Sequence, residues 1–139
     1  MVGVFAKFNK LKSSSIKVIK HYAELPPIWC YADELNQVWT NLVHNALQAM
    51  DDKGTLTIET FPQDNQVLIS IIDNGKGIAP EIKEKIFEPF FTTKRAGEGS
   101  GLGLDIVRKI VKKHEGKITF ESQPGKTTFT VFLPVLPSS

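Results

Sequence analysis

The strongest pattern along the chain is a helical repeat of hydrophobic residues. From Leu35 onward they recur three and four residues apart, the spacing that lays one broad apolar stripe along a helix. The stripe comprises positions 35, 38, 39, 42, 43, 46, 47 and 50. Asp33 precedes it, and aspartate is a favoured residue at a helix N-cap. We therefore expect a core helix that begins at Asp33 and ends near Met50.

A second apolar stripe predicts a helix over residues 102–114. Its members are Leu104, Ile106, Val107, Ile110 and Val111. Gly116 follows at a place where glycine commonly ends a helix. Between the two stripes, Pro80 is a favourable opening for a short helix, which must end by Pro89.

Runs rich in β-branched and alternating residues predict strands. Residues 16–22 alternate between hydrophobic and polar, and two further pairs of runs each flank a turn sequence. Residues 54–61 and 66–72 flank Pro-Gln-Asp-Asn, whereas residues 117–122 and 127–133 flank Pro-Gly, so each pair is expected to form a hairpin. Together with the helices, these strands predict an α+β fold. We expect a two-layer α/β sandwich, its mixed and mostly antiparallel sheet covered on one face by about three helices.

Glycine is concentrated in one part of the chain. Six of the ten glycines lie between Gly75 and Gly103. Residues 87–101 show no period and predict a loop that is long for a small domain without a functional reason. Residues 99–104, Gly-Ser-Gly-Leu-Gly-Leu, then open the second helix, where backbone amides can bind phosphate. The glycines here match neither the spacing of the Walker A motif nor that of the dinucleotide-binding motif.

Carboxamide side chains border the apolar stripe of the first helix. Asn41 and Asn45 are one turn apart and should be half-buried, and Gln48 continues the row. Amide oxygens are ligands that Mg²⁺ accepts when it arrives with phosphates. The two asparagines can instead bond to neighbouring backbone, and from this helix alone that second interpretation is favoured.

Asp73 ends a run of β-branched residues, so we expect its carboxylate at a strand end on the margin of the core. A buried carboxylate needs hydrogen-bond donors, and an exocyclic amine such as that of adenine would supply them. The alternative is a simple turn, because Asp-Asn-Gly is a hairpin signal. Residues 76–80 lead toward a helix rather than a returning strand, which argues against a hairpin.

Aromatic residues precede the glycine-rich stretch. Phe87 is expected to fill the core. Phe90 and Phe91, followed by two threonines and Lys94, suit a lid that closes over a nucleotide and supplies one cation. The nearby glycines predict that this lid is mobile.

Composition narrows the class of protein. A chain of 139 residues, 41% hydrophobic and 23% charged, fits a single soluble domain. Cys30 is the single cysteine, which excludes an internal disulfide, and three histidines give no cluster spaced for zinc. Neither a membrane-spanning stretch nor a secretory leader is visible, so we expect a cytoplasmic location. A net charge of +2 gives no reason to expect a nucleic-acid partner.

Four motifs, in this order, resemble the catalytic ATP-binding domain of sensor histidine kinases, in the GHKL superfamily with gyrase, Hsp90 and MutL ATPase domains. Residues 34–50 (ELNQVWTNLVHNALQAM) are similar to the N box and residues 73–78 (DNGKGI) to the first glycine box. Residues 86–94 (IFEPFFTTK) are similar to the F box and residues 97–104 (GEGSGLGL) to the second glycine box. The similarity covers residues 16–134 and implies a Bergerat-type fold with a mobile ATP lid.

The resemblance implies ATP and Mg²⁺ as cofactors. Asn45 would be the magnesium ligand with Asn41 beside it, and Asp73 would bind the adenine amino group with support from Thr128. Lys94, like Asn41, is expected to be catalytic. The full set of expected site residues is Asn41, Asn45, Gln48, Asp73, Gly75, Gly77, Ile78, Lys94, Gly99, Ser100, Gly101, Leu102, Gly103, Leu104 and Thr128. Some branches carry a phosphate-contacting lysine or arginine where Gln48 stands, so that contact is in doubt here.

The resemblance also implies the kind of reaction. Gyrase and Hsp90 relatives have a glutamate where Asn41 stands, and it acts as base for water attack. Its absence favours phosphoryl transfer, which depends mainly on positioning and charge neutralisation, over hydrolysis. None of His21, His44 and His114 fits the family's phosphoacceptor helix.

The acceptor histidine is therefore expected on a separate dimerisation domain, in cis or in trans, with a response regulator downstream. Residues 1–15 would be an N-terminal stump or added segment and residues 16–139 the catalytic domain, monomeric and nearly or wholly inactive alone. Its parent kinase can be membrane-attached or not. Three alternatives remain: an ATPase-type switch, a serine-kinase regulator and a nucleotide-free scaffold.

Overall fold

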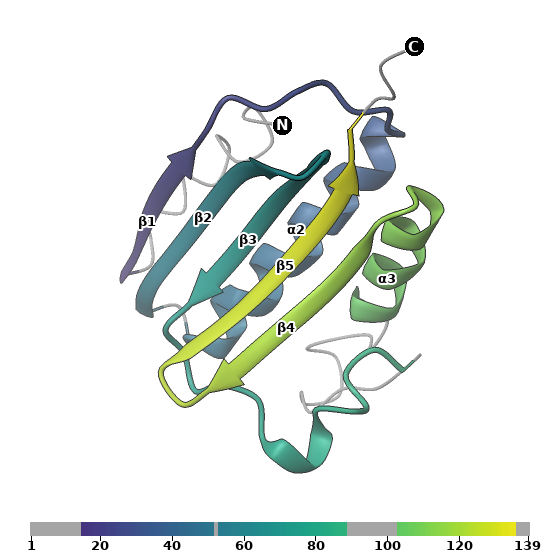
Figure 1. Cartoon of the computed structure of the whole chain (residues 1–139). Coiled ribbons are helices and arrows are strands. Elements are labelled where there is room, and N and C mark those ends of the chain that lie inside the picture. Colours follow the sequence, from purple (N-terminus) through teal and green to yellow (C-terminus); the bar gives the residue numbers. More distant parts are fainter. Residues whose placement is uncertain (1–14, 52, 89–102, 136–139) are drawn as a thin grey trace.

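A five-stranded sheet forms the front layer of the molecule in Figure 1. The computed structural model describes residues 15–51, 53–88 and 103–135. The strands are β1 (Ser15–Tyr22), β2 (Lys53–Gln63), β3 (Gln66–Asp73), β4 (Lys117–Gln123) and β5 (Lys126–Pro134). Their order across the sheet is β1-β2-β3-β5-β4. β1 is parallel to β2 and the other neighbours are antiparallel, so the expected mixed, mostly antiparallel sheet is confirmed.

Two α-helices cover one face of this sheet, α2 (Ala32–Ala49) and α3 (Gly103–Lys113). In the described part of the chain, the short helix expected after Pro80 is a single 3-10 turn, η2 (Pro80–Ile82). The expected α+β sandwich is thus confirmed, and the described residues contribute two α-helices and one 3-10 turn to it. No described helix has both the length and the apolar character needed to cross a lipid bilayer.

The apolar stripe of α2 is the centre of the core. Its buried members are Leu35, Val38, Trp39, Leu42, Val43 and Ala46. They pack against alternate residues of β2 and β3, among them Ile58 and Ile69, which are fully buried. Each such side chain contributes about 1.5–3 kcal/mol through burial. The helix begins one residue before Asp33, with Tyr31 at the N-cap and no side-chain cap bond, so the expected cap was wrong. Asp33 instead lies in the first turn, where its charge is favourable to the helix dipole.

The end of α3 follows a Schellman pattern without glycine in the left-handed position. Glu115 has φ +60° and donates its N–H to the Lys112 carbonyl at 2.9 Å. Gly116 donates to the Val111 carbonyl, also at 2.9 Å. These two bonds satisfy the last helical carbonyls. Gly116 is needed for a different reason, because a Cβ there would overlap the Phe132 carbonyl.

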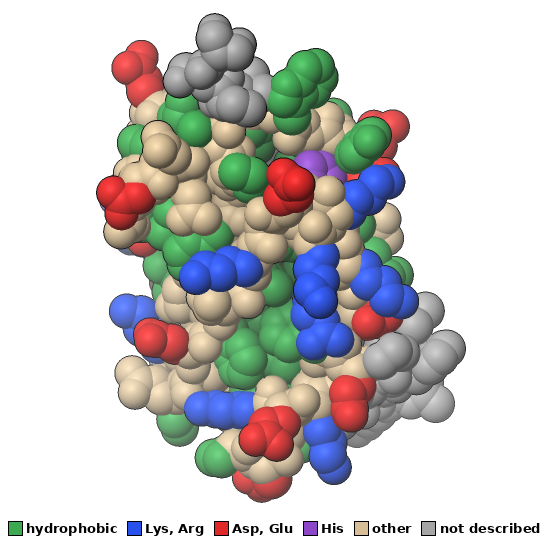
Figure 2. Space-filling view, turned by 45° about the vertical axis from the view of Figure 1, so that its right-hand side comes forward, with side chains coloured by type: hydrophobic (Ala, Val, Ile, Leu, Met, Phe, Trp, Pro, Cys, Tyr) green, Lys and Arg blue, Asp and Glu red, His purple; other side chains and the backbone are tan. Residues whose placement is uncertain are grey.

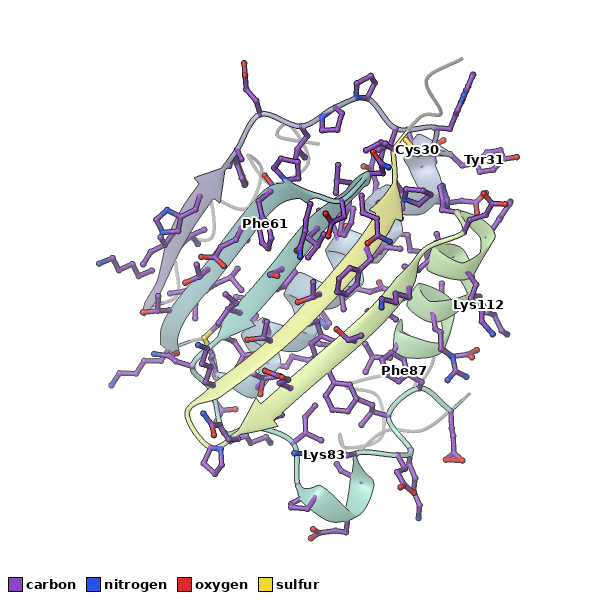
Figure 3. All side chains as sticks on the ribbon, viewed as in Figure 1. Cys30, Tyr31, Phe61, Lys83, Phe87 and Lys112 are labelled. Carbon is purple, nitrogen blue, oxygen red and sulfur yellow. The ribbon has the colours of Figure 1, made fainter. Side chains whose placement is uncertain are left out.

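The start of α2 and the end of α3 are joined by His114. Its Nε2 accepts the Tyr31 amide proton at 2.9 Å, so Nδ1 carries the ring proton and donates it to the Ile110 carbonyl at 2.8 Å. The same end has an ion pair of 2.8 Å between Lys113 and Glu34. Tyr31, labelled in Figure 3, therefore marks the end of the helix layer opposite the β4–β5 turn.

An apolar cavity of about 240 Å³ lies near that end, between the segment that enters α2 and the first turns of the helix. Its lining includes Leu25, Ile28, Leu35 and Trp39. None of the residues expected to bind nucleotide lines it.

Candidate functional site

The expected site residues gather at the opposite end of the molecule from Tyr31. The end of α2, the loop that leaves β3 and the β4–β5 turn come together there, and the first residues of α3 lie beside the middle of α2 (Figure 1). Hydrogen bonds between these four segments fix their relative positions. The sequence motifs 34–50, 73–78 and the start of α3, far apart along the chain, are thus adjacent in the fold.

Asp73 is the last residue of β3 and is 4% exposed. Its Oδ1 accepts the Gly75 amide proton at 2.9 Å. Burial raises the pKa of the Asp73 carboxyl above its ordinary value, and the bond from Gly75 opposes that effect. One donor uses only part of the accepting capacity of a carboxylate, so the group is suited to take a further proton donor from a ligand. The expectation that Asp73 sits at a strand end on the core margin is confirmed.

Thr127, rather than the expected Thr128, is the threonine that faces Asp73. The register pairs Asp73 with Thr127 directly across β3 and β5, which puts both side chains on the helix-covered face. Thr127 is 3% exposed. Thr128 pairs with Ile72 and projects from the other face of the sheet. The structure thus places Thr127, and not Thr128, beside Asp73, and a role of either threonine in base binding stays a prediction.

Ser122, which the sequence pattern alone does not single out, lies next to Thr127. It stands opposite Thr127 in the β4–β5 ladder, and the two hydroxyl oxygens are 2.7 Å apart. Strand alternation is the signal for both: Thr127 is in phase with the buried Phe129, and Ser122 with Phe120.

Two glycines let the loop after β3 pass through a narrow gap. A Cβ on Gly75 would overlap the Ala49 carbonyl at the end of α2. Gly77 has φ +83°, and a Cβ there would lie 2.8 Å from the Gln123 carbonyl oxygen. The Gly125 amide donates to the Gly75 carbonyl at 2.9 Å, which ties the loop to the β4–β5 turn. Larger residues at these two positions would displace the segment that carries Asp73.

Contacts to β4 hold the next part of this loop. The Ile78 amide donates to Ser122 Oγ at 2.7 Å. Lys83, labelled in Figure 3, reaches the end of β4 and donates from Nζ to the Ser122 carbonyl at 2.9 Å. Ile78 itself packs against the core. The loop therefore forms one wall of the site and β4 and β5 form another.

The carboxamides of α2 border this site. Asn41, Asn45 and Gln48 are half-buried, as expected. Asn41 donates from Nδ2 to the Gly103 carbonyl at 3.2 Å, so its amide also bonds to backbone, as the alternative interpretation held. That bond leaves the Asn41 carbonyl oxygen as the group that can accept a donor or a cation.

The donor chemistry at this border fits magnesium that arrives with a nucleotide. In residues 15–51, 53–88 and 103–135, no group of three or more His, Cys, Asp or Glu side chains could hold a metal ion. Neutral amide oxygens such as that of Asn45 are weak ligands, and Mg²⁺ held by few protein oxygens keeps waters and phosphates as its main ligands. The residues present therefore suit Mg²⁺ bound together with phosphates rather than alone.

The first turn of α3 adjoins Asn41 through the Gly103 carbonyl. Leu104 packs against the core, and Asp105 is buried and ion-paired with Lys109 at 3.1 Å. An eleven-residue helix carries partial positive charge at this end. The remaining members of the expected phosphate site lie outside the described residues: Lys94, Gly99, Ser100, Gly101 and Leu102.

Phe87 is partly buried and packs against the core, which agrees with the expected packing role. Its ring centroid is 5.9 Å from that of Phe120 and 6.4 Å from that of Phe129, and the Arg108 guanidinium lies 5.4 Å from it. Figure 2 shows hydrophobic side chains in a hollow between Lys and Arg side chains on the face that it presents. Phe90, Phe91 and the expected mobile lid lie outside the described residues.

Comparisons with known proteins agree with this arrangement. Residues 30–137 match the family described as histidine kinase-, DNA gyrase B-, and HSP90-like ATPase. The chain is 46% identical over 112 residues to the sensor histidine kinase ZraS of Escherichia coli, a match of 80% of this chain and 24% of that protein. It is 43% identical over 115 residues to sporulation kinase E of Bacillus subtilis, 81% of this chain and 15% of that protein. The chain thus spans a quarter or less of these relatives.

Solved structures show the same fold. The nucleotide-free catalytic domain of the histidine kinase ThkA has a TM-score of 0.83 and 34% identity, with 95% of this chain and 88% of that chain covered. ThkA in complex with the response regulator protein TrrA has a TM-score of 0.80 and 32% identity, covering 97% and 39%. Full-length ShkA in complex with AMPPNP has a TM-score of 0.83 and 25% identity, covering 99% and 30%.

Proposed function

We propose that this chain, which belongs to the family of histidine kinase-, DNA gyrase B-, and HSP90-like ATPases, binds ATP with Mg²⁺. In this proposal it donates the γ-phosphoryl group to a histidine of another domain. The resemblance to the catalytic ATP-binding domain of sensor histidine kinases is confirmed by the relatives and by the fold. ATP as the nucleotide, Mg²⁺ as the metal and a histidine as the phosphoryl acceptor are the parts that we propose.

The observation that carries the proposal is the buried carboxylate of Asp73 opposite Thr127. A carboxylate with one backbone donor needs a second donor, and the adenine amino group supplies it. The ring nitrogen beside that amine is an acceptor, which the Thr127 hydroxyl can satisfy directly or through water. Gly77 lets the loop that carries Asp73 pass close to β4, because a Cβ there would lie 2.8 Å from the Gln123 carbonyl oxygen. Guanine presents the opposite pattern of donors and acceptors and would fit poorly.

Phosphate and metal would bind between α2 and α3. Asn45 would hold Mg²⁺ through its amide oxygen, with Asn41 beside it, and Mg²⁺ would neutralise phosphate charge when bound. The amides at the start of α3, from Gly101 to Leu104, would hold the phosphate oxygens with Lys94. Asn41 is bonded to Gly103, so it also sets the distance between the two helices at this point.

The lack of a basic side chain at position 41, where Asn41 stands, supports phosphoryl transfer to a histidine over hydrolysis of ATP by water. A carboxamide does not accept a proton from water at neutral pH, so Asn41 cannot serve as the general base for water attack. The described site then orients the triphosphate without activating a nucleophile. In the proposed step the imidazole nitrogen of the acceptor forms a bond to the γ-phosphorus, the bond to the bridging oxygen breaks, and ADP leaves.

The partners follow from the proposed reaction. The acceptor would be the histidine-bearing dimerisation domain of the parent kinase, in cis or in trans, and a response regulator would receive the phosphoryl group next. That ThkA was solved in complex with a response regulator protein supports a response regulator as a partner. The proposal places the domain in the cytoplasm, where ATP is available, and makes the isolated domain a monomer.

The experiment is a transfer assay with γ-labelled ATP, Mg²⁺ and a helical dimerisation domain that carries the acceptor histidine. We expect label on that domain, lost in acid as phosphohistidine is, and none when its histidine is replaced. Acid-stable label on serine would favour the serine-kinase alternative. Steady release of inorganic phosphate without an acceptor would favour the ATPase switch.

A further inference from the structure

Two hydroxyl side chains and one carboxylate form a row across neighbouring strands at the site. Ser122 on β4, Thr127 on β5 and Asp73 on β3 are successive direct partners in the ladder and project from the helix-covered face. Thr127 and Asp73 are almost fully buried, and Ser122 is half-buried. The row ends in the carboxylate assigned above to the base.

The bond from the Ile78 amide leaves the Ser122 hydroxyl proton available for donation to Thr127. The amide donates to Ser122 Oγ at 2.7 Å, and the Ser122 and Thr127 oxygens are also 2.7 Å apart. Because Ser122 already accepts a proton from the backbone, its own hydroxyl proton is best used toward Thr127. The Thr127 proton is then available on its other side, toward Asp73.

We propose that Ser122 is a positioning residue for base selection: it holds Thr127 as a hydrogen-bond donor toward the ring nitrogen N1 of adenine. This inference rests on the proposed ATP site. Asp73 reads the amino group as a donor, and Thr127, held by Ser122, reads N1 as an acceptor. A Thr127 hydroxyl without Ser122 can rotate and accept instead, so the N1 contact loses its selectivity.

The test compares ATP with 1-deaza-ATP, which keeps the amino group but has C–H in place of N1. Affinities are measured by calorimetry on the full chain with Mg²⁺. In the wild-type chain we expect 1-deaza-ATP to bind about tenfold more weakly than ATP, the effect of one good hydrogen bond. In Ser122→Ala the ratio should fall to less than about threefold.

Matched variants separate this role from a general loss of structure. Ser122→Thr keeps the hydroxyl on a residue suited to strands and should restore the wild-type ratio. Ser70→Ala removes a similar cross-strand pair, since Ser70 Oγ lies 3.0 Å from Thr130 Oγ1, but on the face of the sheet opposite α2 and α3. It should leave the ratio unchanged. If Ser122→Ala does not fold, Ser122→Cys, which keeps the size with a weaker hydrogen-bonding group, should give an intermediate ratio.

Two outcomes overturn the inference. A wild-type chain that binds ATP, with the same ratio in wild type, Ser122→Ala and Ser122→Cys, refutes the role of Ser122 and leaves the proposed function intact. A folded wild-type chain that binds neither nucleotide refutes the proposed function and this inference together. A reduced ratio in Ser122→Ala with recovery in Ser122→Thr supports it.

Discussion

Asp73 and Thr127 face each other directly across β3 and β5, both almost fully buried beneath the helices. A carboxylate and a hydroxyl in this arrangement offer one acceptor and one donor side by side. The adenine edge presents the complementary pair, an amino donor next to a ring acceptor. The base-binding function proposed for this chain depends on that relationship.

The buried charge of Asp73 should oppose folding of the nucleotide-free domain. Burial raises the pKa of this carboxyl in the folded state, whereas the unfolded chain has the ordinary value. Above the folded-state pKa the cost of burying the ionised group is fully present. We therefore expect Asp73→Asn, which can still accept from Gly75, to raise the free energy of unfolding at pH 7.5 by on the order of 1 kcal/mol.

The pH dependence of the difference in unfolding free energy between wild type and Asp73→Asn tests whether the Asp73 pKa is raised in the folded state. As pH falls through the raised pKa, the folded state takes up a proton before the unfolded state does, so the wild-type domain gains stability relative to Asp73→Asn. Urea denaturation of both proteins from pH 7.5 down to about pH 4, close to the ordinary carboxyl pKa of 3.8, should show the gap narrowing once the pH falls through the raised pKa, because the other groups titrate alike in both. A gap that is constant or widens toward low pH would contradict the assignment.

Gly77→Ala should disrupt the loop that carries Asp73. The residue has φ +83°, and the added Cβ would lie 2.8 Å from the Gln123 carbonyl oxygen. We expect a loss of about 2–4 kcal/mol in unfolding free energy. Gly125→Ala is the matched control, since Gly125 has φ +91° but no atom within 4 Å of the place that its added methyl group would take. It should cost about 1 kcal/mol from backbone strain alone; equal losses in both variants would argue against the packing role.

Asn45→Ala should weaken nucleotide binding only when magnesium is present. The proposal assigns Asn45 an amide-oxygen contact to the ion, so its removal affects the metal-bound complex. We expect ATP affinity to fall about tenfold in Mg²⁺ and less than twofold in EDTA. His44→Ala, exposed on the neighbouring position of α2, is the control and should change neither value. An equal loss with and without Mg²⁺ would point to a structural role instead.

His114→Ala should destabilise the domain without affecting nucleotide affinity. The imidazole accepts from Tyr31 and bonds to the Ile110 carbonyl at the end of the helix layer away from Asp73. We expect a loss of about 2–3 kcal/mol in unfolding free energy, from a backbone amide left without its acceptor and a small cavity in place of the buried imidazole. Calorimetry at a temperature where the variant is folded should give wild-type ATP affinity; a large loss would show that the two ends are coupled.

Local patterns predict the elements well because each is decided within a short window. The repeat from Leu35 to Met50 identifies α2 as a core helix, and the Pro124-Gly125 turn identifies the closing hairpin. The predicted β2–β3 turn begins two residues early, since Asp64 and Asn65 alone adopt positive φ there and Pro62 remains in the strand ladder. A proline at this position in a strand is not evident from propensity.

Relations between distant segments are harder to predict. The parallel pairing of β1 with β2 depends on how α2 packs, which no single window contains. Thr127 and Thr128 both fit a strand, and only register with β3 decides which of them faces Asp73. The Ile78 to Ser122 bond likewise joins residues 44 positions apart. Nothing local in the sequence marks such a pair.

Calorimetric titration of the wild-type chain with ATP and with GTP, in the presence of Mg²⁺, tests the central claim most directly. If the Asp73 carboxylate reads the base, ATP should bind and GTP should bind at least about tenfold more weakly. Folded Asp73→Ala should then show no measurable ATP binding. Equal affinity for ATP and GTP, or ATP binding that survives in Asp73→Ala, would contradict the account.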